Sequence, residues 1–116
     1  MISNNLSIAV IGLGYVGLPL AIEFSKKYKT IGFDKNSNRI DELNNFNDKT
    51  LEVDSSVLKE INIKFTKELN DISDCDVYIV SVPTPVDKNK KPDMKPLLAA
   101  SKSVGGLLKK GNVVIY

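Results

Sequence analysis

The sequence predicts an α/β fold built on a doubly wound parallel sheet. Short, almost wholly apolar runs alternate with segments of helical periodicity, and the connections between them are brief. Such apolar runs are typical of parallel strands, because these strands are buried on both faces. The chain of 116 residues, of which 42% are hydrophobic, suits one domain that spans residues 1–116.

The start of the chain predicts a strand, a helix and a second strand. Ser7–Ile11 is an apolar run typical of a buried strand, and a helical period follows from Val16 to about Lys27. The apolar residues that indicate this helix are Val16, Leu20 and Phe24, at spacings of four. The run Thr30–Phe33 predicts the second strand, which ends at Asp34.

The middle of the chain is more polar and predicts shorter elements. Asn36 or Ser37 can cap a second helix. Residues 45–56 are polar and acidic and predict a loop, which leads into a short helical turn near residues 57–61. The run Ile63–Thr66 predicts a weak strand.

The last part of the chain contains the strongest strand signal, the apolar and β-branched run Val77–Val82. A charged loop, Asp87 to Asp93, precedes a helix at about residues 94–108, and residues 113–116 begin a further strand. The positions expected to face inward in this helix are Leu97, Leu98, Val104 and Leu108. Because the sequence stops inside a strand, we expect a sheet truncated within its fifth or sixth strand, in a fragment of a longer protein.

Charge and hydropathy exclude several kinds of partner. Lysine and arginine number 16 against 14 acidic residues, and this balance argues against nucleic acid and against an anionic membrane surface. No apolar run reaches the length of a membrane span, and the N-terminus lacks a basic segment followed by an apolar core. We therefore expect neither a membrane anchor nor a secretory signal.

The titratable residues exclude several kinds of chemistry. The chain has no histidine, which rules out a histidine-based triad, general base or metal ligand within it. Its one cysteine, Cys75, forms no internal disulfide and no zinc cluster, in agreement with a reducing cytoplasm. We expect a cytoplasmic protein with no metal site.

A glycine-rich turn between the first strand and the first helix is the main functional motif. It has the spacing Gly12-x-Gly14-x-x-Gly17, and Asp34 follows 22 residues after Gly12. In a strand–turn–helix context this spacing is typical of Rossmann-type dinucleotide-binding domains, whose glycines permit a tight turn, a close backbone approach to pyrophosphate and close helix packing. The pyrophosphate is expected over the helix N-terminus. The alternative is a tight turn that binds no ligand.

Asp34 is expected to select the cofactor. Its carboxylate would accept hydrogen bonds from the adenosine ribose hydroxyls and repel a 2′-phosphate, which favours NAD over NADP. Lys35 and Arg39 are nearby cations, and their positive charge could allow the 2′-phosphate of NADP to bind. The alternative for Asp34 is a turn or cap residue that contacts no cofactor. Two interpretations of Arg39 stay open, because it could stack on the adenine or be a solvated helix residue.

A second wall of the site is expected at the carboxyl end of the strand Val77–Val82, which should lie beside the first strand. Pro83 and Pro85 stiffen the chain there, and the Thr84 hydroxyl could reach the ribose or the phosphates. The alternative is a stiff strand exit with no ligand. The complete set of expected NAD contacts is Gly12, Leu13, Gly14, Tyr15, Val16, Gly17, Asp34, Arg39, Val82, Pro83 and Thr84.

Three stretches together resemble the N-terminal NAD-binding domain of the UDP-glucose/GDP-mannose dehydrogenase family. They are Ile8–Ala21, which contains GLGYVGLP, Ile31–Asp34 with Arg39, and Ser81–Pro85. The resemblance covers essentially the whole chain, and GLGYVGLP coupled to VPTP is far more specific than a glycine fingerprint alone.

Within the family, the chain is most similar to the branch of UDP-N-acetylhexosamine 6-dehydrogenases. The stretches that carry this similarity are Val82–Asp87, Pro92-Asp93 and Leu97–Ser101. The stretch Asp48–Val53 resembles enzymes that make N-acetylhexosaminuronic acids for surface polysaccharides, such as capsule or O-antigen.

The resemblance implies a four-electron oxidation of a UDP-sugar, in which the C6 alcohol becomes an aldehyde, then a cysteine thioester, and finally the uronic acid, with two NAD reduced per sugar. The nucleophilic cysteine of the family and its lysine and asparagine helpers lie beyond Tyr116, and Cys75 matches no catalytic position. We therefore expect no catalytic residue in this chain, a UDP-sugar bound only with further C-terminal domains, and a homo-oligomeric parent. The alternatives are UDP-glucose or UDP-N-acetylmannosamine as the substrate, or a stand-alone dinucleotide-binding module.

Overall fold

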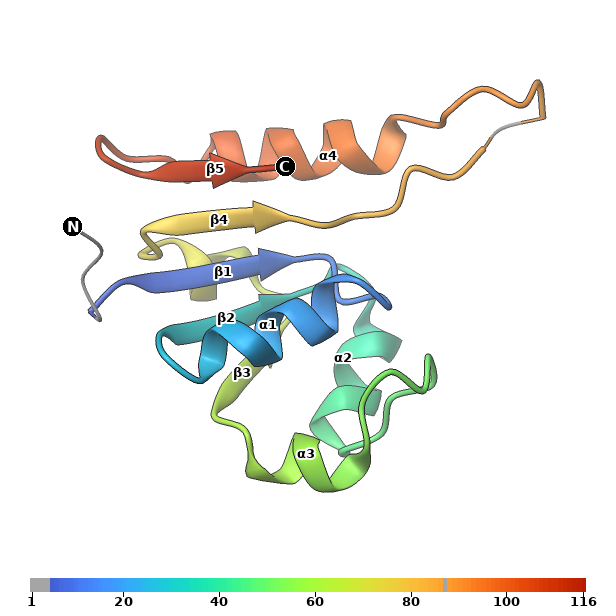
Figure 1. The fold of residues 1–116 in the computed structure, drawn as a ribbon. Coiled ribbons are helices and arrows are strands. Elements are labelled where there is room, and N and C mark those ends of the chain that lie inside the picture. The colour runs from blue at the N-terminus through green and yellow to red at the C-terminus, as the bar shows by residue number, and fades with distance from the viewer. Residues whose placement is uncertain (1–4, 87) are drawn as a thin grey trace.

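Within residues 5–86 and 88–116, which this computed structural model describes, five parallel strands form one sheet in the order β3-β2-β1-β4-β5 (Figure 1). The strands are β1 (Ser7–Ile11), β2 (Lys29–Phe33), β3 (Ile63–Thr66), β4 (Val77–Val80) and β5 (Val113–Ile115). The chain builds outward from β1 to β3 and then returns to β4 on the other side of β1. Strand order therefore reverses between β1 and β4, and the predicted doubly wound fold is confirmed.

The register of the central strands aligns their carboxyl ends. Ile11, the last residue of β1, lies opposite Phe33 on β2 and opposite Val80 on β4. The segments that leave these three strands therefore meet at one edge of the sheet, where open α/β sheets bind their ligands.

The two faces of the sheet are covered by different helices (Figure 1). The helices are α1 (Gly17–Ser25), α2 (Ser37–Asn44), α3 (Ser55–Glu60) and α4 (Lys95–Gly105), with a short 3₁₀ helix, η1 (Leu69–Ile72). Ile8 and Val10 of β1 pack in one apolar cluster with α1, α2 and α3, whereas Ala9 and Ile11 pack in a second cluster with η1 and α4. The alternation of side chains along β1 thus supplies both layers of the core.

Two helices bury other residues than the apolar spacing indicated, and the inward face predicted for α4 is partly wrong. Val16 is exposed because α1 begins at Gly17, and its buried positions are Gly17, Leu18, Ala21 and Ile22. In α4 the small residue Ala100 and Val104 contact the sheet, whereas Leu98 and Leu108 are exposed. In α4 the spacing of large apolar residues misplaced part of the inner face because the small Ala100 makes a close contact, whereas the predicted Val104 is buried and the predicted Leu97 packs against the same cluster.

Some boundaries also differ from the prediction. The strand expected to reach Val82 ends at Val80, the helix expected to reach Leu108 ends at Gly105, and η1 was not predicted. Asp87, which belongs to one of the resembling stretches, lies outside the described residues. Among the helices of residues 5–86 and 88–116, none is long and apolar enough to cross a membrane.

Candidate dinucleotide site

The glycine turn leaves β1 and packs against the end of β4. Gly12 has a φ of 95°, a left-handed conformation that side chains rarely adopt. A Cβ at Gly12 would also lie 2.9 Å from the backbone of Ser81 and Val82, and a Cβ at Gly17 would overlap the Gly12 carbonyl. Gly12 and Gly17 are therefore required by the close contact between turn, strand and helix.

Gly14 differs from the other two glycines of the turn. A Cβ built on Gly14 has no heavy atom within 4 Å, and the residue is exposed. Its carbonyl accepts a hydrogen bond from Leu18 N (3.1 Å), so the turn leads directly into α1. The first amides of a helix have no acceptor within that helix and form its positive end, so the space over Gly14 suits the approach of an anion to the backbone.

Ser81 ties the glycine turn to β4, and the sequence analysis did not identify it. Ser81 Oγ lies 2.8 Å from the carbonyl oxygen of Gly12, and Ser81 N donates to the carbonyl oxygen of Ile11 at 2.8 Å. The hydroxyl thus donates a hydrogen bond to the Gly12 carbonyl within the tight turn. The signal that could have found it is its position between the buried strand and the Val82-Pro83 exit.

Asp34 lies at the carboxyl end of β2, half-buried beside the glycine turn. Its Oδ2 accepts a hydrogen bond from Leu13 N (3.0 Å), and its Oδ1 accepts one from Asn36 N (2.9 Å). The carboxylate is therefore held in place by two backbone amides, with lone pairs left for further donors.

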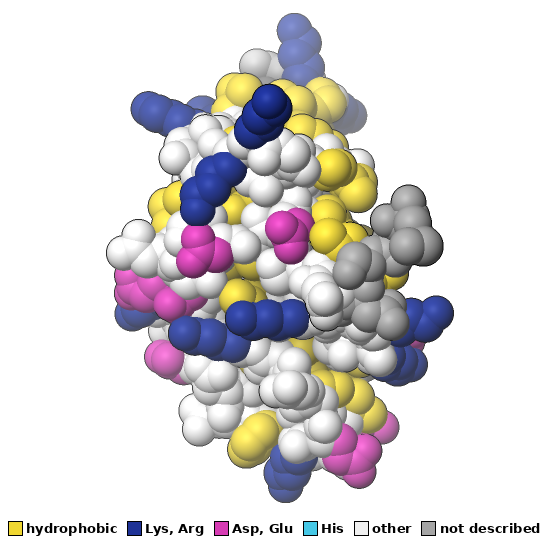
Figure 2. Space-filling model, turned by 90° about the vertical axis from the view of Figure 1, so that its left-hand side faces the viewer, with side chains coloured by type: hydrophobic (Ala, Val, Ile, Leu, Met, Phe, Trp, Pro, Cys, Tyr) yellow, Lys and Arg dark blue, Asp and Glu magenta, His cyan; other side chains and the backbone are white. Residues whose placement is uncertain are grey.

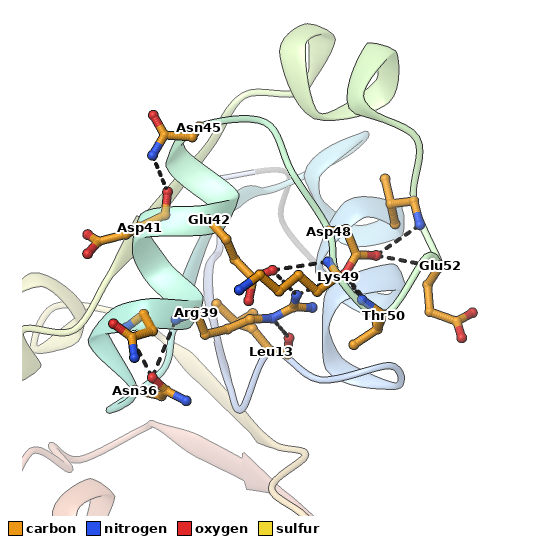
Figure 3. Close-up of polar contacts among 12 residues, drawn as sticks. Leu13, Asn36, Arg39, Asp41, Glu42, Asn45, Asp48, Lys49, Thr50 and Glu52 are labelled. Carbon is orange, nitrogen blue, oxygen red and sulfur yellow. Dashed lines mark hydrogen bonds and ion pairs between the residues drawn. The ribbon is translucent and has the colours of Figure 1, made fainter.

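Arg39 is buried, at 7% exposure, and its interpretation as a solvated helix residue is wrong. Its Nε donates to the Leu13 carbonyl (2.6 Å) and its Nη1 donates to Asp48 Oδ1 (2.8 Å), as Figure 3 shows. Nη1 also lies 3.4 Å from Glu42 Oε2. Among the described residues, Arg39 Nη2 is a buried side-chain atom without a hydrogen-bond partner.

Asp48 is buried, although it belongs to a loop that was predicted from its polar composition. Its carboxylate accepts hydrogen bonds from Arg39 and from Thr50, Glu52 and Val53 of the same loop. Burial by itself raises the pKa of Asp48, but the hydrogen bonds from Thr50 and Arg39 outweigh it and hold the pKa below its ordinary value. Asp48 belongs to the resembling stretch Asp48–Val53, but no local pattern of the sequence distinguishes it as a site residue from a solvated carboxylate.

A cleft of about 660 Å³ lies at the carboxyl edge of the sheet, between the glycine turn and α4. The predicted contacts that line this cleft are Gly12, Leu13, Gly14, Asp34, Arg39, Val82 and Pro83. Tyr15, Val16, Gly17 and Thr84 lie outside its lining. An apolar wall that was not predicted comes from Pro96, Ala99 and Ala100. The cleft therefore gathers most of the expected contacts, while their role toward a cofactor stays a prediction.

Cys75 lies at the other end of the strands, just before β4. It is buried, and burial raises the pKa of its thiol. Figure 2 views this amino end of the sheet, where Lys and Arg side chains are interspersed with Asp and Glu. Because Cys75 lies at the amino ends of the strands and the cleft lies at their carboxyl ends, Cys75 is remote from the cleft.

The residues around the cleft fit a dinucleotide. The open space over Gly14 at the start of α1 suits a pyrophosphate, and Asp34 presents a carboxylate to hydroxyl donors. The cleft volume lies within the range of about 300–1,000 Å³ that is typical of small-molecule sites. Within residues 5–86 and 88–116, no group of three or more Cys, Asp or Glu side chains is placed to hold a metal ion.

A parallel sheet with a glycine turn and a cleft at its switch point defines a Rossmann-type dinucleotide-binding domain. Residues 6–116 match the profile of the NAD binding domain of the UDP-glucose/GDP-mannose dehydrogenase family. The chain belongs to this family and is an NAD-binding domain of it.

Three relatives illustrate the similarity. UDP-N-acetyl-D-glucosamine 6-dehydrogenase of Pseudomonas aeruginosa is 56% identical, and the protein of that name from Salmonella typhi is 48% identical, each over 97% of this chain and 27% of the relative. The structure of UDP-D-ManNAc dehydrogenase from Pyrococcus horikoshii matches with a TM-score of 0.84 at 33% identity, over 94% of this chain and 27% of that one. The chain thus spans about 27% of the length of these relatives.

Proposed function

We propose that this chain supplies the NAD site of a nucleotide-sugar 6-dehydrogenase that oxidises C6 of a UDP-N-acetylhexosamine to the uronic acid. The three relatives described above are all named for UDP-N-acetylhexosamines, which supports this substrate class. Within the class, the identity of 56% and 48% to UDP-N-acetyl-D-glucosamine 6-dehydrogenases, compared with 33% to the UDP-D-ManNAc dehydrogenase, favours N-acetylglucosamine over N-acetylmannosamine. UDP-N-acetylmannosamine and UDP-glucose are the alternative substrates.

The proposed roles of the residues follow from their positions. The amides of residues 14–17 bind the pyrophosphate, since Gly14 leaves space for it at the start of α1. Asp34 binds the adenosine ribose hydroxyls, and Val82-Pro83 forms the wall at the switch point. Thr84 is exposed beyond the lining, and we propose that its hydroxyl contacts the cofactor from the rim. When bound at these residues, NAD would supply the acceptor for the hydride that leaves C6 of the sugar.

We also propose that the catalytic groups and the NAD site belong to different domains of the parent protein. The cysteine that carries the thioester, and the groups that assist it, belong to further domains of the parent protein, and the UDP-sugar binds between those domains and this one. Sites of this kind form at domain interfaces. We further propose a cytoplasmic, homo-oligomeric parent that binds no nucleic acid and supplies uronic acids for a surface polysaccharide such as capsule or O-antigen.

Cofactor choice is tested by titration of the chain with NAD and with NADP, followed by calorimetry. We expect NAD to bind more tightly, because Asp34 occupies the place of a 2′-phosphate. Asp34→Ala should weaken NAD binding at least about tenfold, since charge-assisted hydrogen bonds contribute about 1.5–3 kcal/mol each. Equal or tighter binding of NADP to the unmodified chain would contradict the role of Asp34.

Activity is tested with the 116-residue chain and with the full-length parent side by side. The chain alone should produce no NADH from any UDP-sugar, because hydride transfer needs the sugar C6 held within roughly 3–3.5 Å of the acceptor carbon. The parent should form two NADH per UDP-N-acetylhexosamine. Turnover by the chain alone would overturn the division of labour, and a parent that oxidises only UDP-glucose would overturn the substrate class. A complete protein that ends near Tyr116 would instead be a stand-alone binding module.

A further inference from the structure

We propose that Asp48 is a positioning residue for the dinucleotide, which acts through Arg39 on the backbone of the glycine turn. This inference rests on the proposed NAD site and adds a residue from the loop between α2 and α3, which neither the glycine motif nor the Val82-Pro83 exit includes.

Arg39 connects the loop to the turn with two different nitrogen atoms. It reaches from the first turns of α2, where its Nε donates to Leu13 O at 2.6 Å and its Nη1 donates to Asp48 Oδ1 at 2.8 Å (Figure 3). Both contacts are buried, with 7% exposure for Arg39 and 4% for Asp48. A planar guanidinium held at one nitrogen has a fixed direction at the others, so Asp48 determines where Nε points.

The Asp48 carboxylate is itself rigidly held. Besides Arg39, its Oδ1 accepts from Thr50 N (3.0 Å) and Thr50 Oγ1 (2.6 Å), and its Oδ2 accepts from Glu52 N (2.9 Å) and Val53 N (3.0 Å). Every one of these partners is a donor, so the site requires an acceptor at both oxygen atoms. An ionised aspartate meets this requirement, whereas an asparagine would place an amide group against N–H donors.

The peptide group between Leu13 and Gly14 connects the hydrogen bond from Arg39 to the space in which we propose that the pyrophosphate binds. Its carbonyl oxygen accepts from Arg39 Nε, and its N–H belongs to Gly14. In a planar trans peptide these two groups point in opposite directions. The hydrogen bond from Arg39 therefore fixes the direction of the Gly14 amide, on the residue over which the turn leaves open space.

The other side of Leu13 is fixed independently. Leu13 N donates to Asp34 Oδ2 at 3.0 Å, so Asp34 and Arg39 hold the two peptide groups that flank Leu13. When Asp48 loses its charge, Glu42 is the remaining carboxylate near Arg39, since its Oε2 lies 3.4 Å from Nη1. The guanidinium then turns toward Glu42 and releases the Leu13 carbonyl, while Asp34 stays in place.

Asp48→Asn tests the proposal in the 116-residue chain, with Asp76→Asn as the matched control. Asp76 also accepts hydrogen bonds from two donors, Ser7 N (2.9 Å) and Ser7 Oγ (3.1 Å), in a partly buried position, but it lies at the amino end of β4, away from the cleft. We expect Asp48→Asn to raise the Kd for NAD about tenfold, as for the loss of a charge-assisted hydrogen bond, and Asp76→Asn to leave it unchanged. Circular dichroism and thermal unfolding compare the folded populations.

A spectroscopic measurement separates positioning from general destabilisation. In ¹H–¹⁵N spectra of the ligand-free chain, the Gly14 amide resonance should shift in Asp48→Asn and keep its place in Asp76→Asn. Arg39→Lys is the second variant, and it decides the question if Asp48→Asn does not fold. Lysine keeps the positive charge near Asp48 but has no Nε donor for Leu13, so this variant should shift the Gly14 resonance and weaken NAD binding in the same way.

The outcomes distinguish this proposal from the proposed function. If the unmodified chain fails to bind NAD, the proposed function falls, and the Gly14 resonance still tests the link from Asp48 to the turn. If the unmodified chain binds NAD and folded Asp48→Asn binds it equally well, only the role of Asp48 is overturned. Weak binding by Asp48→Asn with normal binding by Arg39→Lys would also overturn it, because the effect would then not pass through Arg39.

Discussion

At Gly14 the position that a Cβ would occupy is empty, whereas at Gly12 and Gly17 it is filled by backbone atoms. The same residue type therefore serves two purposes within six residues of sequence. Gly12 and Gly17 allow β1, β4 and α1 to meet closely, and Gly14 leaves open the surface of the turn where we propose that the ligand binds. This difference makes the site testable without unfolding the protein.

Gly14→Val should abolish NAD binding while the domain stays folded. The valine side chain meets no protein atom near its Cβ, but it projects into the space that a pyrophosphate needs. Calorimetry measures the binding, and circular dichroism checks the fold. Gly17→Ala is the informative comparison, because its Cβ overlaps the Gly12 carbonyl and should destabilise the fold itself. Normal NAD affinity in a folded Gly14→Val chain would show that the pyrophosphate does not lie there.

At the residue scale, the sequence predicted the close packing at Gly12 and Gly17 but not the environment of Arg39. The spacing from Gly12 to Gly17 and the acid at Asp34 are local patterns with a known geometry. Arg39 and Asp48 are nine residues apart, and their contact depends on how the chain between them folds back. A charged residue in a polar loop is solvated in most proteins. No local pattern in the sequence therefore predicted that Arg39 and Asp48 form a buried pair.

At the element scale, α2 carries Arg39 to the glycine turn, and its start is fixed by a side-chain cap. Asn36 Oδ1 accepts hydrogen bonds from Asn38 N (3.0 Å) and Arg39 N (3.4 Å), which confirms one of the two predicted caps. Caps and strand runs could be predicted because they depend on neighbouring residues. The inner face of α4 could be predicted only at Leu97 and Val104, because the rest of the face depends on which residues the sheet leaves room for.

Asn36→Ala should lower the free energy of unfolding by about 1 kcal/mol, since it leaves two amides of the first turn without their acceptor. For a domain of this size the midpoint of thermal unfolding should fall by about 4 °C. Ser37→Ala is the control, because it changes the neighbouring exposed residue and keeps the cap. Equal midpoints for the two variants would mean that the cap contributes nothing to stability.

At the scale of the whole molecule, the buried Asp48 links stability to acidity. The pKa of Asp48 lies below its ordinary value of 3.8, so its contribution is complete above pH 3.8 and is lost as the pH falls through the lower, folded-state pKa. Urea unfolding at a series of pH values should show the midpoint falling in this acid range. In Asp48→Asn the midpoint should be lower at pH 7 and should fall less steeply on acidification. Parallel curves for the two chains would assign the acid sensitivity to other carboxylates.

The strand order places β1 in the centre of the sheet, bonded to β2 on one side and β4 on the other, while β5 forms an edge with Val113 and Ile115 exposed. Edge segments open by local fluctuation, whereas a central strand is released only when the sheet comes apart. In deuterated water the amides of Val10 and Ile11 should therefore exchange most slowly, at the rate set by global unfolding, and the amide of Val114 should exchange much faster. Equal protection of β1 and β5 would contradict this gradient. Because the glycine turn continues directly from β1, the proposed binding site is attached to the strand that we expect to open last.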